Sequence, residues 1–377
     1  MAELVAGKII NDRFEVTEHI DTGGFASVWK GHDRQLDRIV AIKRLVSERI
    51  NDPALREEAI SEARKIAAIS HPNIVSVFDV IDYEGEILIV MEYLSGGSLH
   101  DYLRNLSKVG KWVCPVMSFD LIRGILSGLN AAHTSDRGPI IHKDLKPLNI
   151  LFDRRRQPKI ADFGIASIGV VDAIETTYPG KWEHEGTLGY KSPEQLKGSR
   201  LDTRSDLFNV GLIAYLLFVQ FHPFIDPRFL FDYREMVLDP YRPVQKYDSA
   251  RLPSETNAFL DALLSVDPEK RYSTAAEALS EFDHIRGKYE NNLLDLSLNK
   301  YDFLKGNRTE DVLMSALEIA KGIFQCSRNG FYAQGAFLYE KSGMDFSDLN
   351  SEEKANLENN YNICRRRAGQ EVSTDVN

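Results

Sequence analysis

The sequence has few cysteines and no basic leader segment. Its three cysteines, Cys114, Cys326 and Cys364, are far apart and odd in number. A disulfide framework needs paired cysteines, so this pattern argues against one and favours a reducing compartment. Residues 1–7 contain no basic stretch leading into an apolar one, which argues against a secretory signal peptide. We therefore expect a cytoplasmic protein.

The chain also lacks a basic excess and an apolar run of membrane-spanning length. Its formal net charge of −10 argues against nucleic-acid binding, which leaves a basic footprint. The most apolar stretch, residues 207–221, is shorter than the ~20 residues that cross a bilayer, so we predict a buried helix and no membrane contact. A hydrophobic content of 43% and a length of 377 residues indicate a soluble protein of two or three domains.

What the chain does contain is a spaced set of three oxygen-bearing side chains. Asp144 lies five residues before Asn149 and eighteen before Asp162, in the segments IHKDLKPLN (141–149) and DFG (162–164). Such a set supplies a proton acceptor and two oxygen ligands for Mg²⁺, which transfer of a γ-phosphoryl group requires. The DFG segment alone is a weak signal, but the ordered pair is specific. Through it the chain resembles the protein kinases, most closely their serine/threonine branch.

The resemblance implies roles for the residues of these segments. Asp144 would accept or orient the proton of the acceptor hydroxyl, and Asn149 and Asp162 would hold Mg²⁺, or alternatively Mn²⁺. Lys146 would balance charge on the transferred phosphoryl group, and Thr187 would pack beside Asp144 and Lys146. Both Lys146 and Thr187 indicate serine/threonine rather than tyrosine specificity.

The phosphate-binding loop is less complete. Kinases cover the ATP phosphates with a G-x-G-x-x-G-x-V hairpin, because glycine lets backbone N–H groups approach the oxygens. Residues 20–28, IDTGGFASV, keep Gly23 in register, followed by Gly24, whereas Asp21 and Ala26 replace the outer glycines. The Asp21 carboxylate would weaken ATP affinity. Taken alone, this segment fits an ordinary hairpin equally well.

Lys43 supports the nucleotide-binding interpretation, because it follows Val28 by fifteen residues, as in kinases. It would neutralise the α- and β-phosphates and needs a carboxylate to hold it. The family spacing, nine residues before the histidine of an HPNIV turn at 71–75, selects Glu62. The alternative is that Glu62 belongs to the solvated face of a helix.

The resemblance places adenine against residues 91–94. Main-chain groups of Glu92 and Leu94 would hydrogen-bond the purine, and Met91 would stand behind the pocket. The apolar side chains expected to line the nucleotide site are Ile20, Val28, Ala41 and Leu151.

Further positions match structural parts of the family. Glu194, on the expected substrate platform, would pair with Arg271, and Asp206 would brace the backbone of the catalytic loop. His142 is expected to be a packed core residue and not a catalyst.

One departure bears on regulation. Lys143 stands where kinases that are switched on by loop phosphorylation carry an arginine, whose bidentate grip on phosphate lysine cannot copy. Thr176 and Thr177 are candidate phosphosites, and whether they control activity stays open.

The resemblance implies an α+β, bilobal protein-kinase-like fold, and the coarse pattern adds a C-terminal helical extension. Strands are expected over 14–17, 27–30, 38–43, 74–81 and 87–92, with a helix over 51–69. After a hinge at 95–98, helices are expected over 119–133, 207–221, 255–264 and 274–288, the last opened by a capping box of Thr274 and Glu277. We divide the chain into an N-terminal segment (1–12), a small lobe (13–94), a large lobe (95–287), a helical extension (288–367) and a disordered tail (368–377).

The extension lies outside the resemblance. Residues 312–324 form an apolar helical stripe, and 331–339 and 352–367 are shorter helix candidates. Short helices make a marginal independent bundle, so we expect them to dock on the large lobe or on a protein partner, with no catalytic role.

The sequence thus predicts an ATP- and Mg²⁺-dependent serine/threonine kinase that acts on protein substrates, itself included. Three alternatives remain. The incomplete glycine loop fits a pseudokinase that binds nucleotide without turnover. A small-molecule phosphotransferase shares the Asp–Asn loop but lacks the platform that contains Thr187 and Glu194. A scaffold would present residues 289–367 as its partner surface.

Overall fold

The computed structural model describes residues 4–22, 26–45, 52–108, 113, 115–163, 188–219, 222–224, 252–303, 351 and 354–363. Several predicted features lie outside these ranges. They are Gly23 and Gly24, the candidate phosphosites Thr176 and Thr177, Thr187, the stripe 312–324, the helix candidate 331–339 and the tail 368–377.

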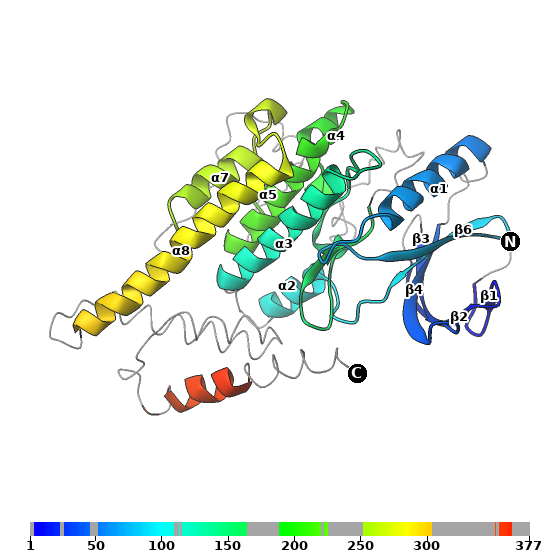
Figure 1. Cartoon of the computed structure of the whole chain (residues 1–377). Coiled ribbons are helices and arrows are strands. Elements are labelled where there is room, and N and C mark those ends of the chain that lie inside the picture. The colour runs from blue at the N-terminus through cyan, green and yellow to red at the C-terminus, as the bar shows by residue number, and fades with distance from the viewer. Residues whose placement is uncertain are drawn as a thin grey trace.

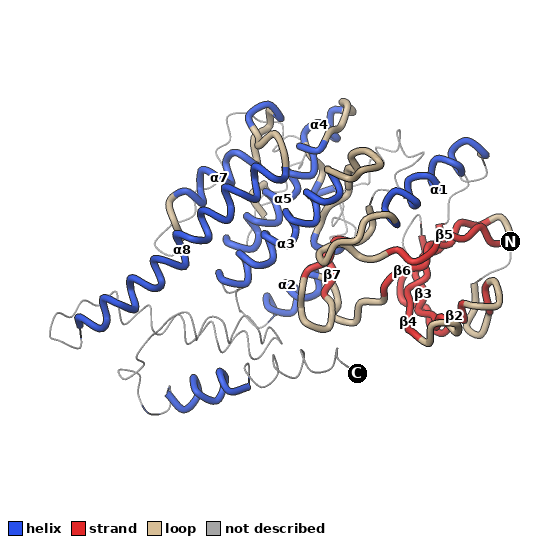
Figure 2. Tube along the Cα trace, in the orientation of Figure 1, coloured by secondary structure: helices blue, strands red, loops and turns tan. Residues whose placement is uncertain are grey.

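The first part of the chain forms a twisted antiparallel sheet with one helix. Its strands are β1 (Ile9–Ile10), β2 (Phe14–Thr22), β3 (Ala26–Asp33), β4 (Arg38–Leu45), β5 (Val77–Tyr83) and β6 (Glu86–Glu92), in the spatial order β1-β2-β3-β4-β6-β5. Helix α1 (Pro53–Ala67) packs beside β5 and begins at the N-cap Asp52, whose side chain accepts the Ala54 N–H. Figure 2 shows the strands gathered at one end of the molecule and most helices at the other.

The sheet begins earlier than the predicted small lobe. Strand β1 pairs Ile9 with Glu15 and Ile10 with Phe14. Ile10 is fully buried and Leu4 is 1% exposed, both in the same apolar cluster as Phe14. Residues 4–12 are therefore part of the small lobe's core, and the predicted boundary at residue 12 cuts through the sheet.

The second lobe is mainly helical. It contains α2 (Leu99–Lys108), α3 (Pro115–His133), the hairpin β7 (Ile150–Phe152) and β8 (Pro158–Ile160), α4 (Pro193–Lys197), α5 (Thr203–Val219), α7 (Glu255–Leu263) and α8 (Ala275–Phe303). Figure 1 shows α3, α5 and α8 running side by side, with the sheet beyond α2. The predicted fold, a small β-rich lobe followed by a large helical lobe, is confirmed.

Helix α5 is the buried helix predicted from the apolar run. Its side chains are buried almost throughout, from Ser205 to Phe218. The described part of the chain contains no helix long and apolar enough to span a membrane.

Helix α8 begins where the capping box predicts but continues well past residue 288. Thr274 Oγ1 accepts the Glu277 N–H at 3.1 Å, and the Glu277 carboxylate accepts the Ser273 N–H at 2.8 Å. The helix is held on α3 by ion pairs of Arg286 with Asp120 and of Arg123 with Asp283, both at 2.8 Å. Since this packing continues to Tyr289, which stacks on Phe119, the extension starts as a prolongation of the large lobe.

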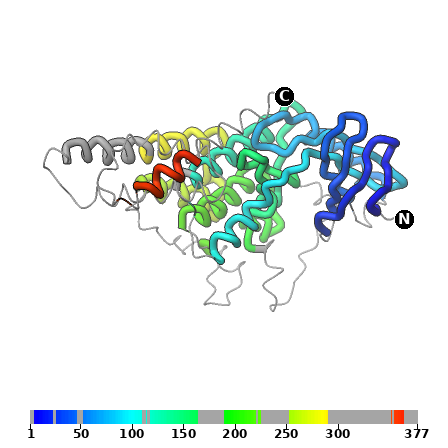
Figure 3. Tube along the Cα trace, turned by 90° about the horizontal axis from the view of Figure 1, so that it is seen from below, coloured from blue at the N-terminus to red at the C-terminus, as the bar shows by residue number. Residues whose placement is uncertain are grey.

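A short helix over residues 354–363, red in Figure 3, falls within the predicted helix 352–367. Its Leu357 is 3% exposed and belongs to the core cluster of the large lobe, and Tyr361 packs against that cluster. This part of the extension agrees with the expected docking on the large lobe.

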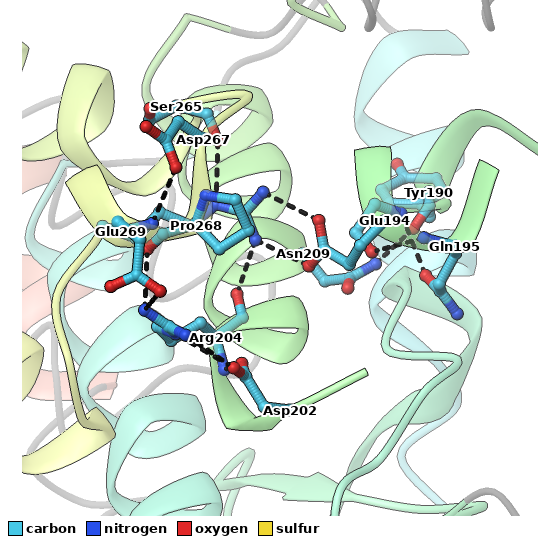
Figure 4. Close-up of polar contacts among 12 residues, drawn as sticks. Tyr190, Glu194, Gln195, Asp202, Arg204, Asn209, Ser265, Asp267, Pro268 and Glu269 are labelled. Carbon is cyan, nitrogen blue, oxygen red and sulfur yellow. Dashed lines mark hydrogen bonds and ion pairs between the residues drawn. The ribbon is translucent and has the colours of Figure 1, made fainter. Parts of the chain in front are cut away.

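A buried ion pair joins α4 to the loop between α7 and α8. Arg271 Nη1 and Nη2 donate to the two carboxylate oxygens of Glu194 at 2.8 and 2.9 Å, and its remaining N–H groups reach the carbonyls of Ser265 and Arg204. The Arg271 side chain is fully buried, and the predicted pair is confirmed. Figure 4 shows Glu194 inside this network and Arg204 beside it, paired with Asp202 and Glu269.

We expect Arg271→Met to lower the free energy of unfolding by about 3–5 kcal/mol, because it leaves a buried carboxylate uncompensated. The control is Arg104→Met, which breaks the pair with Asp101 between side chains 57% and 47% exposed. That change should cost at most ~1 kcal/mol. Urea denaturation of both variants measures the difference, and equal losses would contradict the assignment.

Asp33, at the end of β3, is a second buried carboxylate that the sequence did not indicate. Its side chain is fully buried and accepts hydrogen bonds from Arg13 Nε at 2.9 Å and Nη2 at 2.8 Å, as well as from backbone N–H groups of Gln35 and Leu36. The Arg13 hydrogen bond, acting against burial, lowers the pKa of the Asp33 carboxyl to about 2.

A depressed carboxyl pKa stabilises the folded state above the unfolded pKa, and this stabilisation is lost as the pH falls toward the folded value. For Asp33 the window runs from its ordinary value of 3.8 down to about 2. Urea denaturation across this range should show wild-type stability falling toward that of Asp33→Asn. A difference between the two proteins that stays constant below pH 4 would contradict this assignment.

Candidate active site between the lobes

The catalytic-loop backbone is held by one buried carboxylate at the start of α5. Asp206 Oδ2 accepts the His142 N–H at 2.8 Å and Oδ1 accepts the Lys143 N–H at 2.9 Å. His133 Nε2 lies 2.8 Å from Oδ2. Lys143 has a φ of 65°, which a side chain-bearing residue adopts only when its surroundings hold it there. The predicted bracing role of Asp206 is confirmed.

His142 is the packed core residue that the sequence predicts. It is fully buried, its Nε2 donates to the Ala161 carbonyl at 2.8 Å, and its Nδ1 accepts the Asp144 N–H at 3.2 Å. Its ring lies 4.8 Å from that of Phe163. Through these contacts His142 joins the loop of Asp144 to the segment that carries Asp162.

Asp144, Lys146 and Asn149 converge as predicted. Lys146 Nζ lies 2.8 Å from Asp144 Oδ2. Asn149 Nδ2 donates to the Asp144 carbonyl at 2.8 Å and approaches Oδ2 at 3.3 Å. Because the amide nitrogen is turned toward Asp144, the amide oxygen of Asn149 is the atom available to a cation.

Asp162 and Lys43 form the second polar centre. Lys43 Nζ, on β4, lies 2.7 Å from Asp162 Oδ1. Loss of hydration would raise the pKa of the Asp162 carboxyl, but the nearby positive charges, with the Lys43 ammonium foremost, together outweigh it, so the pKa lies below its ordinary value. Asp162 is therefore ionised at neutral pH, as a metal ligand must be.

The predicted partner of Lys43 is not the one that the structure provides. Glu62, on α1, has its Oε1 3.7 Å from Lys143 Nζ, and the partner of Lys43 is Asp162. Burial raises the pKa of the Glu62 carboxyl, although the Lys143 ammonium acts in the opposite direction. The sequence spacing identified the right helix and a partly buried carboxylate, but the expected Lys43–Glu62 pair is not formed.

The position of α1 accounts for the pairing of Glu62 with Lys143 and not with Lys43. Arg56, near its N-terminal end, donates to the Gly85 carbonyl at 2.6 Å and pairs with Asp82 at 2.6 Å. Both contacts hold the start of the helix against the β5–β6 hairpin. Contacts of this kind set the position of the whole helix α1. That position decides which ammonium group the Glu62 carboxylate can reach.

The residues expected around adenine lie on neighbouring strands. Ala41 on β4, 7% exposed, is opposite Met91 on β6, and Val28 is opposite Lys43. The Glu92 N–H donates to the Ser76 carbonyl at 2.9 Å, so this N–H is already engaged by the protein. The remaining lining residues occupy β2 (Ile20, 46% exposed), the segment after β6 (Leu94) and β7 (Leu151, half-buried).

The hinge after β6 passes tightly over β7. A Cβ on Gly96 would lie 2.5 Å from the Phe152 carbonyl oxygen, so only glycine fits there. The Gly96 N–H donates to that carbonyl at 3.0 Å. The segment 95–98, predicted to be the hinge, is thus attached to strand β7.

Asp21 is exposed, and its Oδ1 accepts the Thr22 N–H at 2.8 Å. The carboxylate expected near the nucleotide therefore has a local partner on its own strand.

Among the residues that the structure describes, sequence reasoning missed Lys191 at the site. Lys191, just after Tyr190, places its Nζ 3.6 Å from Asp144 Oδ1. The only available signal was a lysine directly before the segment 192–194. The contact spans 47 positions of the chain, from 144 to 191, and no local pattern reports it.

Comparison with known proteins agrees with this geometry. Residues 14–282 match the family model described as "Protein kinase domain". A probable serine/threonine-protein kinase, SCO3848 of Streptomyces coelicolor, is 34% identical over 273 residues, which is 71% of this chain and 39% of that protein. Serine/threonine-protein kinase PknB of Mycobacterium leprae is 32% identical over 281 residues, which is 73% of this chain and 43% of that protein. The chain spans about two fifths of the length of these relatives.

Proposed function

This chain belongs to the protein kinase family, and we propose that it transfers the γ-phosphoryl group of ATP to serine or threonine hydroxyls of proteins. The observation that carries the proposal is the convergence of two centres, Asp144 with Lys146 and Asn149, and Asp162 with Lys43. The names of the relatives, which are serine/threonine-protein kinases, support the choice of acceptor.

The donor set fits a hard divalent cation. Asp162 offers an ionised carboxylate and Asn149 an amide oxygen, and Mg²⁺ in nucleotide sites commonly takes few protein oxygens besides those of the phosphates. We propose that these two residues hold Mg²⁺, or alternatively Mn²⁺. When bound, the cation would neutralise charge on the phosphates.

The side chains of this chain divide the remaining work. Asp144 orients the acceptor hydroxyl and takes its proton. Lys146, already 2.8 Å from Asp144, lies where its ammonium can balance charge on the phosphoryl group during transfer. Lys43 binds phosphate oxygens of ATP, and its present partner Asp162 keeps it directed into the site.

Two alternatives receive less support. A pseudokinase would be expected to lack a member of the catalytic set, and Lys43, Asp144, Asn149 and Asp162 are all present. A small-molecule phosphotransferase has no use for a peptide platform, and the buried Glu194–Arg271 pair, which holds α4, supports such a platform in this chain. Autophosphorylation at Thr176 or Thr177, a cytoplasmic location and a partner for the C-terminal extension belong to the proposal.

The proposal is tested by phosphate transfer to a generic protein and to the chain itself. Asp144→Asn should lower kcat by about 10²–10⁴-fold, because it removes the proton acceptor and leaves the shape of the site. Lys43→Met and Asp162→Asn should also lower kcat. When either is combined with Asp144→Asn, the losses should not add, since these catalytic residues act as a unit. Asp136→Asn, an exposed aspartate after α3, is the matched control. Unchanged transfer by Asp144→Asn would refute the mechanism, and transfer to tyrosine would refute the acceptor class.

The Glu62–Lys143 pair generates a separate prediction. Kinase turnover uses a pair between the β-strand lysine and the helix glutamate, so Lys143 competes with Lys43 for Glu62. Lys143→Met should raise kcat/KM for ATP a few fold, Lys143→Arg should leave it near wild type, and Glu62→Gln should lower it. If Lys143→Met and Glu62→Gln lower activity equally, the Glu62–Lys143 pair is itself the productive arrangement.

A further inference from the structure

Lys191 lies at the reacting centre but has no part in the mechanism derived above. Its Nζ is 3.6 Å from Asp144 Oδ1, and both side chains are 30% exposed. A hydroxyl that reaches Asp144 therefore approaches a second ammonium besides that of Lys146.

The backbone on either side of Lys191 is firmly held. The Gly189 carbonyl accepts from His222 Nε2 at 2.7 Å, and the Tyr190 carbonyl accepts from Asn209 Nδ2. On the other side, the buried Ser192 caps α4, and its N–H donates to Gln195 Oε1 at 2.9 Å. Lys191 thus extends toward Asp144 from a backbone that is held on both sides.

Lys191 is not needed to hold Asp144 in position, because Lys146 already does so. At 3.6 Å the Lys191 ammonium is beyond hydrogen-bond distance of Oδ1, whereas Lys146 holds Oδ2 at 2.8 Å. A lysine acts as a point charge and needs no fixed geometry, so its ammonium can also attract another carboxylate close by.

We propose that Lys191 is a specificity-determining residue that favours acceptor sites with an acidic residue directly beside the serine or threonine. The inference rests on the proposed function. An acceptor hydroxyl must come within about 3 Å of Asp144 to be deprotonated, and neighbouring Cα atoms are about 3.8 Å apart. The side chain next to the acceptor therefore enters the space around Lys191, where a carboxylate is attracted and an ammonium is repelled.

The test uses alanine-based peptides with a single serine flanked, before or after it, by glutamate, glutamine or lysine. Wild type should prefer glutamate over glutamine and glutamine over lysine in kcat/KM, at one flanking position at least, by about three- to tenfold per step. Lys191→Met should remove the preference and Lys191→Glu should reverse it. Lys197→Glu, an exposed lysine on the neighbouring α4, is the matched control and should keep the wild-type order.

The outcomes separate this inference from the proposed function. A Lys191→Glu protein that keeps the wild-type order, or a Lys191→Met protein that slows all peptides equally, overturns the specificity role. Failure of wild type to phosphorylate any peptide or protein counts against the proposed function. Equilibrium binding of the same labelled peptides, with thermal unfolding to verify each fold, still tests the charge preference in that case. Equal affinity of wild type and Lys191→Glu for all peptides would then refute it.

Discussion

The hydrogen bonds that Asp206 accepts hold the reacting part of the molecule in place. Its carboxylate receives two consecutive backbone N–H groups, those of His142 and Lys143, while Lys143 is in the left-handed region. That geometry turns the chain so that Asp144 faces outward and Lys146 and Asn149 close around it. Asp206 can do this because α5 is buried along its length and cannot shift without opening the core.

A second group of contacts connects the catalytic loop to α4 and to the segment before it, which contains Lys191. Gln195 Nε2 donates to the Lys143 carbonyl at 2.6 Å, so α4 is joined to the same loop that Asp206 braces. The Glu194–Arg271 pair then fixes α4 to the loop between α7 and α8. These contacts fix the backbone position of Lys191. Its ammonium group therefore lies beside Asp144.

The charged groups of the site are arranged as contacts between lysines and carboxylates. Asp162 holds Lys43, Glu62 holds Lys143, and Asp144 lies between Lys146 and Lys191. Asp144 lies near two ammonium groups, and lysine tolerates a change of partner better than arginine because it needs no bidentate geometry. Nucleotide and acceptor would add negative charge to such a site, so partner exchange is an expected part of turnover.

Much of the site was determined by the sequence, because its members are close along the chain. Asp144, Lys146 and Asn149 lie on one short loop, so their spacing predicts that they lie close together. The apolar run of α5 and the cap at Thr274 are likewise local, and both appear where the pattern placed them. The pairing of Glu194 with Arg271 was predictable only through the family resemblance, because 77 residues separate the two.

The tertiary structure alone decided which charges meet across the lobes. Spacing placed Glu62 on the right helix, but its partner depends on where α1 sits as a body, held by Arg56 against the β5–β6 hairpin. Lys191 and the buried Asp33 became visible only when distant strands and loops were brought together. Local patterns report propensity and periodicity, whereas ion-pair partners depend on distances between elements that packing sets. For this reason the sequence determined the chemistry of the site, and the fold determined which lysine stands beside each carboxylate.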